Sequence, residues 1–213
     1  NITLINIVNS GIRPTYDPTK CKDCGTCIEV CPGYETIKES QQDHTGIIRE
    51  LNQNWGTILE VWEGYATDPD IRFRGSSGGL ASALALYCLE KKGMTGVLHT
   101  AADETDPLLN KTVLSRTRSD ILSRTGSRYS PASPCDGLGL IESASSPCAF
   151  IGKPCDVAAF QKAVLLKPVL DKKVGAVIGI FCAGTPSTQG TIDLLNKLHI
   201  NTDNVSALRY RGK

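Results

Sequence analysis

Hydrophobic and polar positions alternate along most of this chain in a pattern that predicts short strands followed by helices. From Leu80 to Lys92 the apolar residues recur at helical spacing, Ser77 can cap the start of this helix, and Gly93 can end it in the left-handed conformation. Val174 to Cys182 is apolar throughout, as expected for a central strand of a parallel sheet. These two segments predict an α/β architecture.

The same alternation continues between and after these segments. Buried strands are predicted for Gly96 to Ala102, Thr112 to Arg118 and Cys148 to Ile151. Helical segments are predicted for Ser119 to Thr125, from Asp156 to about Lys167, and from Ser187 to about Leu198. The fold class is therefore α/β, with a largely parallel sheet that is flanked by helices.

The first 60 residues have a different texture. Ile2 to Val8 is one short strand candidate in an ordered arm, and Tyr34 to Arg49 is polar with scattered apolar residues, as suits a small cap around a cofactor. We therefore predict two parts. Residues 1–60 form an arm and a ferredoxin-like iron–sulfur segment, and residues 61–213 form the α/β domain.

Four cysteines organise the N-terminal part. They are separated by two, two and three residues and are followed by Pro32, which is the spacing of bacterial ferredoxins. A structural zinc knuckle is the alternative, but zinc sites pair two C-x-x-C units across a longer loop. The spacing predicts a 4Fe-4S cluster bound by Cys21, Cys24, Cys27 and Cys31.

A second cluster is possible because the fourth cysteine of such a run ligates the other cluster in two-cluster ferredoxins. Cys88 lies on the apolar face of a predicted helix and is interpreted as a core residue. The remaining cysteines then supply the ligands needed for two clusters, and the alternative is one cluster with these thiols free. The candidate distal ligands are Cys135, Cys148, Cys155 and Cys182.

Composition and charge exclude several classes of protein. The 213 residues suffice for one α/β core with a small appendage, and 23 basic against 22 acidic residues give no basic block for nucleic acid. No apolar run approaches the ~18 residues of a transmembrane segment.

Nine cysteines, four of them in one motif, favour the reducing cytoplasm over secretion. Asn1 to Asn9 lacks an initiator Met and a signal-peptide pattern, so we expect the chain to begin inside a longer product.

Two kinds of turn carry candidate chemistry. A glycine- and serine-rich turn opens the helix at Leu80, where backbone N–H groups and the helix dipole can bind an anion, although a structural turn would look the same. Cys155 lies at a helix start beside Lys153, which favours thiolate, and Cys182 ends a strand where α/β sheets place ligands. The residues of the anion-site candidate are Arg74, Gly75, Ser76, Ser77, Gly78 and Gly79.

Residues 61–213 resemble the beta-subunit family of coenzyme F420-reducing hydrogenase, and a ferredoxin-like segment ahead of this domain is similar to the family's usual layout. Several short motifs carry the resemblance, in the family's order. They are Gly64 to Ala66, Asp68 to Arg72, Gly75 to Gly79, Gly126 to Tyr129, Ala149 to Asp156 and Gly179 to Ser187.

The resemblance implies an FAD domain that exchanges hydride with coenzyme F420 or another two-electron carrier and relays single electrons through clusters to a partner subunit or ferredoxin. It implies that the turn at Arg74 to Gly79 binds the FAD diphosphate. Because ligands of such sheets gather at the carboxyl ends of the strands, we expect the flavin ring near the turns that follow Ala149 to Gly152 and Val177 to Cys182. Further implied cofactor-binding residues are Ser127, Tyr129, Gly152 and Pro154.

Two departures from the family pattern matter. The family's Gly-Thr-Pro-Cys has Lys153 in place of threonine, so its ammonium is a candidate catalytic group facing the reduced flavin, with a plain surface lysine as the alternative. Relatives continue well beyond Arg209 to Lys213, so we expect a truncated C-terminus. Two alternative functions stay open for this chain, namely ferredoxin-dependent reduction of an organic substrate at the flavin, and electron transfer without catalysis.

Overall fold

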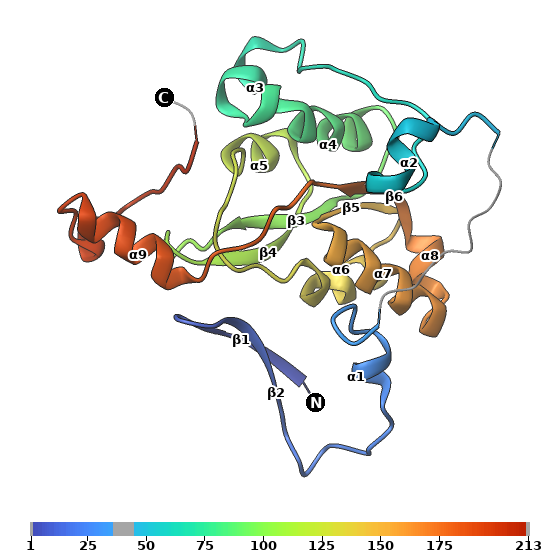
Figure 1. Ribbon diagram of the computed structural model, residues 1–213, viewed down its shortest axis with the longest axis horizontal. Coiled ribbons are helices and arrows are strands. Elements are labelled where there is room, and N and C mark those ends of the chain that lie inside the picture. The colour runs from blue at the N-terminus through green and yellow to red at the C-terminus, as the bar shows by residue number, and fades with distance from the viewer. Residues whose placement is uncertain (1, 36–44, 212–213) are drawn as a thin grey trace.

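A four-stranded sheet lies at the centre of the computed structural model, which describes residues 2–35 and 45–211 (Figure 1). The strands are ordered β4 (Asn110–Ser115), β3 (Val97–Ala102), β5 (Cys148–Gly152) and β6 (Val174–Gly179). β3 pairs with β5 and β5 with β6 in parallel, whereas β3 and β4 are antiparallel. The predicted α/β class with a largely parallel sheet is confirmed.

Helices cover both faces of this sheet. On one face lie α3 (Pro69–Arg74), α4 (Leu80–Glu90) and α5 (Arg118–Ser123), and on the other lie α6 (Leu138–Glu142), α7 (Pro154–Leu166) and α8 (Val169–Lys173) (Figure 1). A last helix, α9 (Thr188–Lys197), stands beside the sheet. The short 3₁₀ turns are η1 (Ser77–Gly79), η2 (Pro134–Gly137) and η3 (Thr202–Asn204).

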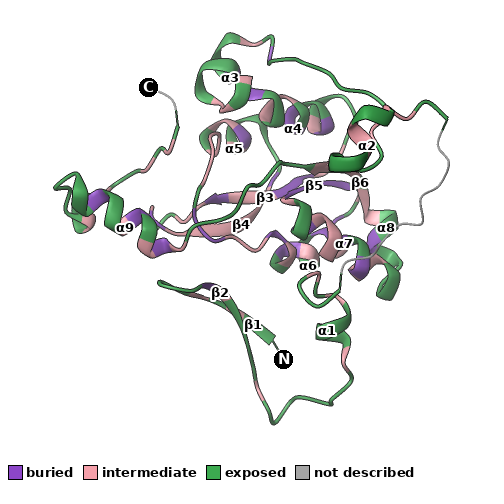
Figure 2. Cartoon of the chain, viewed as in Figure 1, coloured by how far each residue is buried: buried purple, intermediate pink, exposed green. Residues whose placement is uncertain are grey.

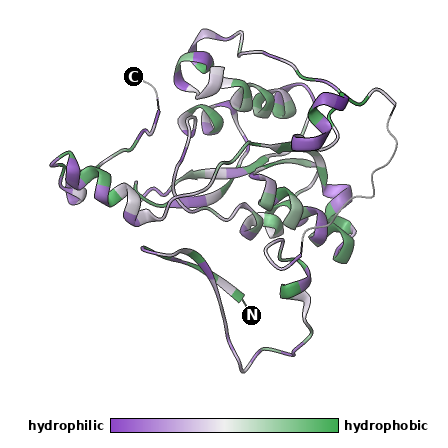
Figure 3. Ribbon diagram, viewed as in Figure 1, coloured by the Kyte–Doolittle hydropathy of each residue, from purple (hydrophilic) through white to green (hydrophobic). Residues whose placement is uncertain are grey.

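Alternation along the strands divides the core into two layers, because successive side chains of a strand point to opposite faces. Val97 and Ala149 pack with the α4 side, whereas Leu98 and Phe150 pack with the α6 and α7 side. Buried residues concentrate in the central strands (Figure 2), and hydrophobic residues run along the same strands (Figure 3). The sheet is therefore the scaffold that positions the turns at its ends.

The helix predicted from Leu80 is confirmed as α4, but its start differs from the expectation. Gly79 is the N-cap residue, with φ 74°, and no side chain caps this helix, so the expectation that Ser77 caps it is wrong. The 3₁₀ turn η1 takes up Ser77 before α4 begins, which removes its hydroxyl from the cap position. Gly93 is left-handed as predicted, with φ 64°.

The strand predicted for Val174 to Cys182 forms, but its central position is wrong. Among the described residues β6 pairs only with β5, and it ends at Gly179. Alternate positions are open to solvent, and 42% of Val177 is exposed. A continuous apolar run does not distinguish these positions, because Val, Ile, Ala and Gly fit an edge strand as well as a central one.

The N-terminal arm is a hairpin of β1 (Ile2–Ile7) and β2 (Gly11–Tyr16), followed by the short helices α1 (Thr26–Glu29) and α2 (Arg49–Trp55). The hairpin contacts the start of α9, where the Asn6 side chain donates to Thr188 Oγ1 at 2.9 Å. Most of the predicted polar cap, residues 36–44, lies outside the described residues. No described helix has the length and apolar character required to cross a membrane.

Candidate functional site

The cysteine-rich loop exposes all four of its cysteines to solvent, whereas Gly25 and Val30 between them are half-buried. Gly25 begins α1 with φ 75°, a left-handed conformation that reverses the chain between the second and third cysteines. The side chain and the N–H of Thr26 hydrogen-bond to the thiol of Cys24 and lower its pKa, which favours the thiolate form that iron requires. The loop carries the exposed, free thiols of Cys21, Cys24, Cys27 and Cys31.

These four thiols fit an iron–sulfur cluster by number, spacing and chemistry. They are accessible, none forms a disulfide, and N–H groups of α1 can donate to sulfur. Within residues 2–35 and 45–211, however, no three Cys, His, Asp or Glu side chains are grouped tightly enough to hold a metal ion. Gathering the sulfurs therefore belongs to cluster assembly, because metal binding and local folding are coupled.

The structure does not bring the distal cysteines together with this loop. Cys148 is fully buried in β5, and burial raises the pKa of its thiol. Cys135 donates to the carbonyl oxygen of Asp156 at 3.3 Å, and burial raises its pKa to about 12. Cys155 and Cys182 are exposed. Ligation by Cys148 or Cys135 would thus require the core to open.

Cys88, the fifth cysteine outside the cysteine-rich loop, lies on α4 and packs in the core as predicted, and burial raises the pKa of its thiol. Like Cys148 it lies in the apolar interior, where a thiol behaves as a small hydrophobic group.

The glycine-rich turn has three consecutive left-handed residues. Ser77, Gly78 and Gly79 have φ values of 50°, 69° and 74°. A β-carbon at Gly79 would lie 2.6 Å from the carbonyl oxygen of Ile71, and one at Gly78 would lie 2.9 Å from Tyr65 Cβ. The packing of the turn itself therefore requires glycine, so a larger side chain here would disturb the turn whether or not a ligand binds.

Segments that are remote in sequence converge on this turn. The N–H of Ser127 donates to Ser76 Oγ at 3.0 Å, and Nη1 of Arg211 lies 3.5 Å from both Ser77 Oγ and Tyr129 Oη. One guanidinium group and several hydroxyl groups thus surround the approach to α4. This arrangement suits a phosphate group, because arginine offers planar, charge-assisted donors.

Sequence reasoning missed Arg209 and Arg211 as site residues. Arg209 donates to the carbonyl oxygens of Phe73 and Arg74, at 3.1 and 3.2 Å, and so fastens the C-terminal segment over the turn. The pair of arginines around Tyr210 was the available signal, since two guanidinium groups in one short segment are typical of anion sites.

Arg128 contacts the same C-terminal segment at Leu208 and Tyr210. Its guanidinium group donates to the carbonyl oxygens of Pro107 and Leu208 and lies 5.3 Å from the centre of the Tyr210 ring. Desolvation lowers the pKa of Arg128, but the group stays charged at any physiological pH. Tyr210 in turn stacks edge-on against Tyr129, with ring centres 5.6 Å apart.

Arg74, predicted to contact the anion, is engaged elsewhere. It forms an ion pair with Asp70 at 2.8 Å, one turn earlier on α3. A depression of about 470 Å³ lies between α3 and α5, lined by Arg74 and Arg118, and Arg118 pairs with Asp68 and Glu90. Carboxylates therefore neutralise both arginines, whereas the guanidinium group of Arg211 contacts the hydroxyl groups of Ser77 and Tyr129 at the turn.

The turn after β5 is built around Asp156. Its carboxylate accepts from the backbone N–H of Lys153 at 2.8 Å and from Lys153 Nζ at 2.7 Å. A β-carbon at Gly152 would lie 2.7 Å from Asp156 Cβ, and Pro154 occupies the first turn of α7. The ammonium group of Lys153 is thus half-buried and paired with Asp156, and it does not stand free at the surface.

The ends of β5 and β6 lie at the same edge of the sheet, because the two strands are parallel neighbours. The N–H of Ile180 donates to the carbonyl oxygen of Gly152 at 2.9 Å, which holds the two turns together. Phe181 follows with 90% of its surface exposed and meets Trp55 edge-on at 6.1 Å. An exposed aromatic pair therefore lies close to the Cys182 turn.

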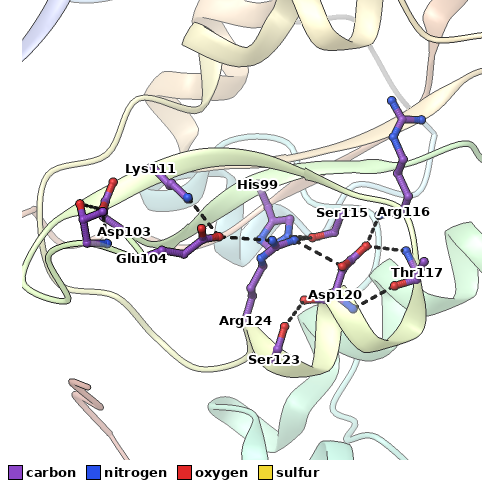
Figure 4. A network of polar contacts seen from close by, with 11 residues as sticks. His99, Asp103, Glu104, Lys111, Ser115, Arg116, Thr117, Asp120, Ser123 and Arg124 are labelled. Carbon is purple, nitrogen blue, oxygen red and sulfur yellow. Dashed lines mark hydrogen bonds and ion pairs between the residues drawn. The ribbon is translucent and has the colours of Figure 1, made fainter. Parts of the chain in front are cut away.

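A separate polar network ties α5 to the β3–β4 pair (Figure 4). His99 Nδ1 lies 3.0 Å from the carbonyl oxygen of Thr100, so Nδ1 carries the proton and Nε2 accepts from Ser115 Oγ at 2.8 Å. Burial lowers the pKa of His99, and Arg124 donates to the same Ser115 oxygen at 2.9 Å. Both ring nitrogens of His99 therefore have local partners, and we interpret the network as structural.

Three models of protein families match the chain. Residues 61–138 match the N-terminal part of "Coenzyme F420 hydrogenase/dehydrogenase, beta subunit", and residues 146–213 match the C-terminal part of the same subunit. Residues 13–37, which contain the four cysteines of the exposed loop, match a 4Fe-4S binding domain.

Individual relatives agree with these matches. The chain is 31% identical over 132 residues to the coenzyme F420 hydrogenase subunit beta of Methanococcus voltae, covering 59% of this chain and 45% of the relative. It is 30% identical over 125 residues to the same subunit of Methanosarcina barkeri, covering 55% and 42%. The chain thus spans less than half the length of these relatives.

A solved structure shares the fold. It is a chain of the F420-reducing [NiFe] hydrogenase complex from Methanosarcina barkeri, studied as a xenon derivative, with a TM-score of 0.60 and 25% identity. The match covers 69% of this chain and 52% of that one.

Proposed function

The chain belongs to the coenzyme F420 hydrogenase/dehydrogenase beta-subunit family and carries a 4Fe-4S binding segment, and from this premise we propose that it is a flavin-dependent oxidoreductase subunit. In this proposal FAD exchanges hydride with coenzyme F420, and the iron–sulfur segment relays single electrons to a redox partner. The resemblance identified from the sequence motifs is confirmed.

The division of labour explains the need for two cofactors. Iron–sulfur clusters move one electron at a time, whereas a deazaflavin carrier such as coenzyme F420 moves a hydride. FAD supplies the conversion between two-electron and one-electron chemistry when it is bound. The protein contributes binding, orientation and charge at the two sites.

We propose that the FAD diphosphate binds at the start of α4. The observation that supports this site is that Arg211 contacts both Ser77 and Tyr129 there. A cation and hydroxyl groups meet there at the N-terminus of an eleven-residue helix, whose dipole favours an anion. Ser76, held by the N–H of Ser127, fixes the entry to the turn. Arg74 is proposed to contribute only its backbone to this site, because its side chain is paired with Asp70.

The flavin ring is proposed to lie near the joined turns after β5 and β6. Gly152 and Pro154 shape the first of these turns, and the carboxyl ends of parallel strands are where such sheets bind ligands. Lys153 remains a candidate catalytic residue, but its pairing with Asp156 means that the ring would meet an ion pair in place of a free ammonium group.

A single cluster is the simpler form of the proposal. Four exposed cysteines in one loop supply all its ligands, whereas a second cluster would draw on the partly buried Cys135 and the fully buried Cys148. We expect about four iron atoms per chain, whereas about eight would indicate that a second cluster is bound.

Cofactor analysis of anaerobically purified protein tests the proposal. We expect flavin absorption bands, FAD after denaturation, and iron with acid-labile sulfide. Rapid bleaching of the flavin by reduced coenzyme F420 would support the hydride exchange. Bleaching by reduced ferredoxin alone would favour the alternative, reduction of an organic substrate. A protein that binds iron but no flavin after reconstitution with FAD would be an electron-transfer module, and the proposal would be wrong.

A further inference from the structure

Lys162 on α7 makes an unusual contact with the cysteine-rich loop. Its Nζ donates to the carbonyl oxygen of Cys31 at 3.3 Å, although 131 positions separate the two residues. The N–H of Tyr34 donates to the same oxygen at 3.2 Å and closes the turn after the fourth cysteine. α1 and the chain that follows it lie on the α7 side of the molecule, opposite α4 (Figure 1).

Lys162 is a buried residue with no carboxylate partner in the part of the chain that the structure describes. Only 8% of this residue is exposed, which is rare for lysine. Lys153 and Lys167, at the two ends of the same helix, pair with Asp156 and Glu142, but no ion pair among the described residues includes Lys162. A carbonyl oxygen compensates only part of the desolvation of a cation, and buried charges are normally paired.

We propose that the missing anion is the iron–sulfur cluster at Cys31, and that Lys162 raises its reduction potential. This inference rests on the proposed cluster but not on the proposed FAD site. Reduction adds one electron, and hence one negative charge, to an assembly that already contains four thiolates. A cation that is screened little by water stabilises the reduced state more than the oxidised one.

The contact also gives Lys162 a positioning role. Its hydrogen bond fixes the carbonyl group of Cys31 against α7, so the loop holds one orientation toward the α/β domain when the cluster assembles. Electron transfer between the two parts depends on such a fixed approach. Lys162 therefore acts through the cluster and its loop and touches no reacting group itself.

The test is the midpoint potential of the cluster in full-length protein, followed by its EPR signal during a redox titration, with iron and sulfide counted in parallel. Lys162→Met removes both the charge and the donor, Lys162→Gln keeps a donor without charge, and Lys162→Arg keeps both. Lys167→Met is the matched control, because it removes a lysine charge from the end of the same helix, where Lys167 pairs with Glu142 at 3.0 Å.

We expect a lower potential in Lys162→Met and Lys162→Gln, with the wild-type value in Lys167→Met and a value near it in Lys162→Arg. Loss of iron from both neutral variants but not from Lys162→Arg would equally support a required charge. Unchanged potentials at full iron content, or equal loss of iron from all three Lys162 variants, would overturn the inference. Wild-type protein that binds no cluster after reconstitution would instead refute the cluster assignment, and the inference with it.

Discussion

The two parts of this chain reach an ordered structure by different means. In the stretch from residue 2 to residue 35 Gly11 is the only buried residue, and its four cysteines lie open to solvent. In the α/β domain every residue of β5 is buried, and apolar side chains pack on both of its faces. The domain therefore carries its own core, whereas we expect the N-terminal part to depend on a bound cluster and on contacts with the domain.

This difference has a consequence for electron transfer. Within the described residues, specific polar contacts join the N-terminal part to the domain, such as Asn6 with Thr188 and Lys162 with the carbonyl group of Cys31. Individual polar contacts can fix the orientation of the cysteine-rich loop relative to the domain without burying much surface. We expect substitutions to separate cleanly into those that affect the cluster and those that affect the domain.

The largest effect is expected from Cys24→Ser. Serine is a poor ligand for iron in place of thiolate, so the cluster absorption should disappear while the far-ultraviolet circular dichroism and the thermal unfolding of the α/β domain persist. Cys155→Ser is the control, since Cys155 is equally exposed but lies outside the loop. Full iron content in Cys24→Ser would contradict the ligand assignment, and loss of iron in Cys155→Ser would point to a second cluster.

Phe150→Ala tests how far the α/β domain depends on its packed core. Phe150 is fully buried in β5 and stacks on Phe160 at 5.2 Å, so its loss should lower the free energy of unfolding by about 3–5 kcal/mol. Urea unfolding followed by circular dichroism measures this change. The exposed Ile28 in α1 offers a control, because Ile28→Ala should alter domain stability by less than about 0.5 kcal/mol. Equal effects would mean that the two parts unfold as one unit.

Arg211→Met should weaken FAD binding without loss of iron. A charge-assisted contact of an exposed arginine contributes roughly 1–2 kcal/mol, which corresponds to a five- to thirtyfold rise in the dissociation constant. Fluorescence titration of the FAD-depleted protein measures it. Arg13→Met removes an arginine from the N-terminal hairpin and should change nothing. If both variants bind FAD as tightly as the wild type does, the diphosphate lies elsewhere.

The smallest effect is expected from Lys153→Met. It removes the ion pair with Asp156 and leaves that carboxylate with backbone donors only, so the free energy of unfolding should fall by about 1 kcal/mol. The flavin potential and the rate of flavin reduction decide whether Lys153 also acts in catalysis. A lower potential or slower reduction at full cofactor loading would support that role. Unchanged values would restrict Lys153 to the turn after β5.

Local patterns in the sequence predicted the elements that depend on a few neighbouring residues. The spacing of Cys21 to Cys31 indicated an iron–sulfur segment, and helical periodicity located α4 to within two residues of its end. Several short elements were not predicted, and α3 and β2 illustrate why. Asp68 and Pro69 form a regular helix start for α3, where Asp68 accepts from two N–H groups, and Pro14 concealed β2 because proline is uncommon in strands.

Other features depend on contacts between distant residues, and only the tertiary structure decided them. The sequence of the β6 run was compatible with either an edge or a central strand, and the order of the sheet placed it at the edge of the described part. Cys148 and Cys155 look equally available in sequence, yet one faces the core and the other faces solvent. Arg211 meets Ser77 across 134 positions and Lys162 meets Cys31 across 131, and no local periodicity encodes such pairs, because they form only when the sheet has set which surfaces face one another.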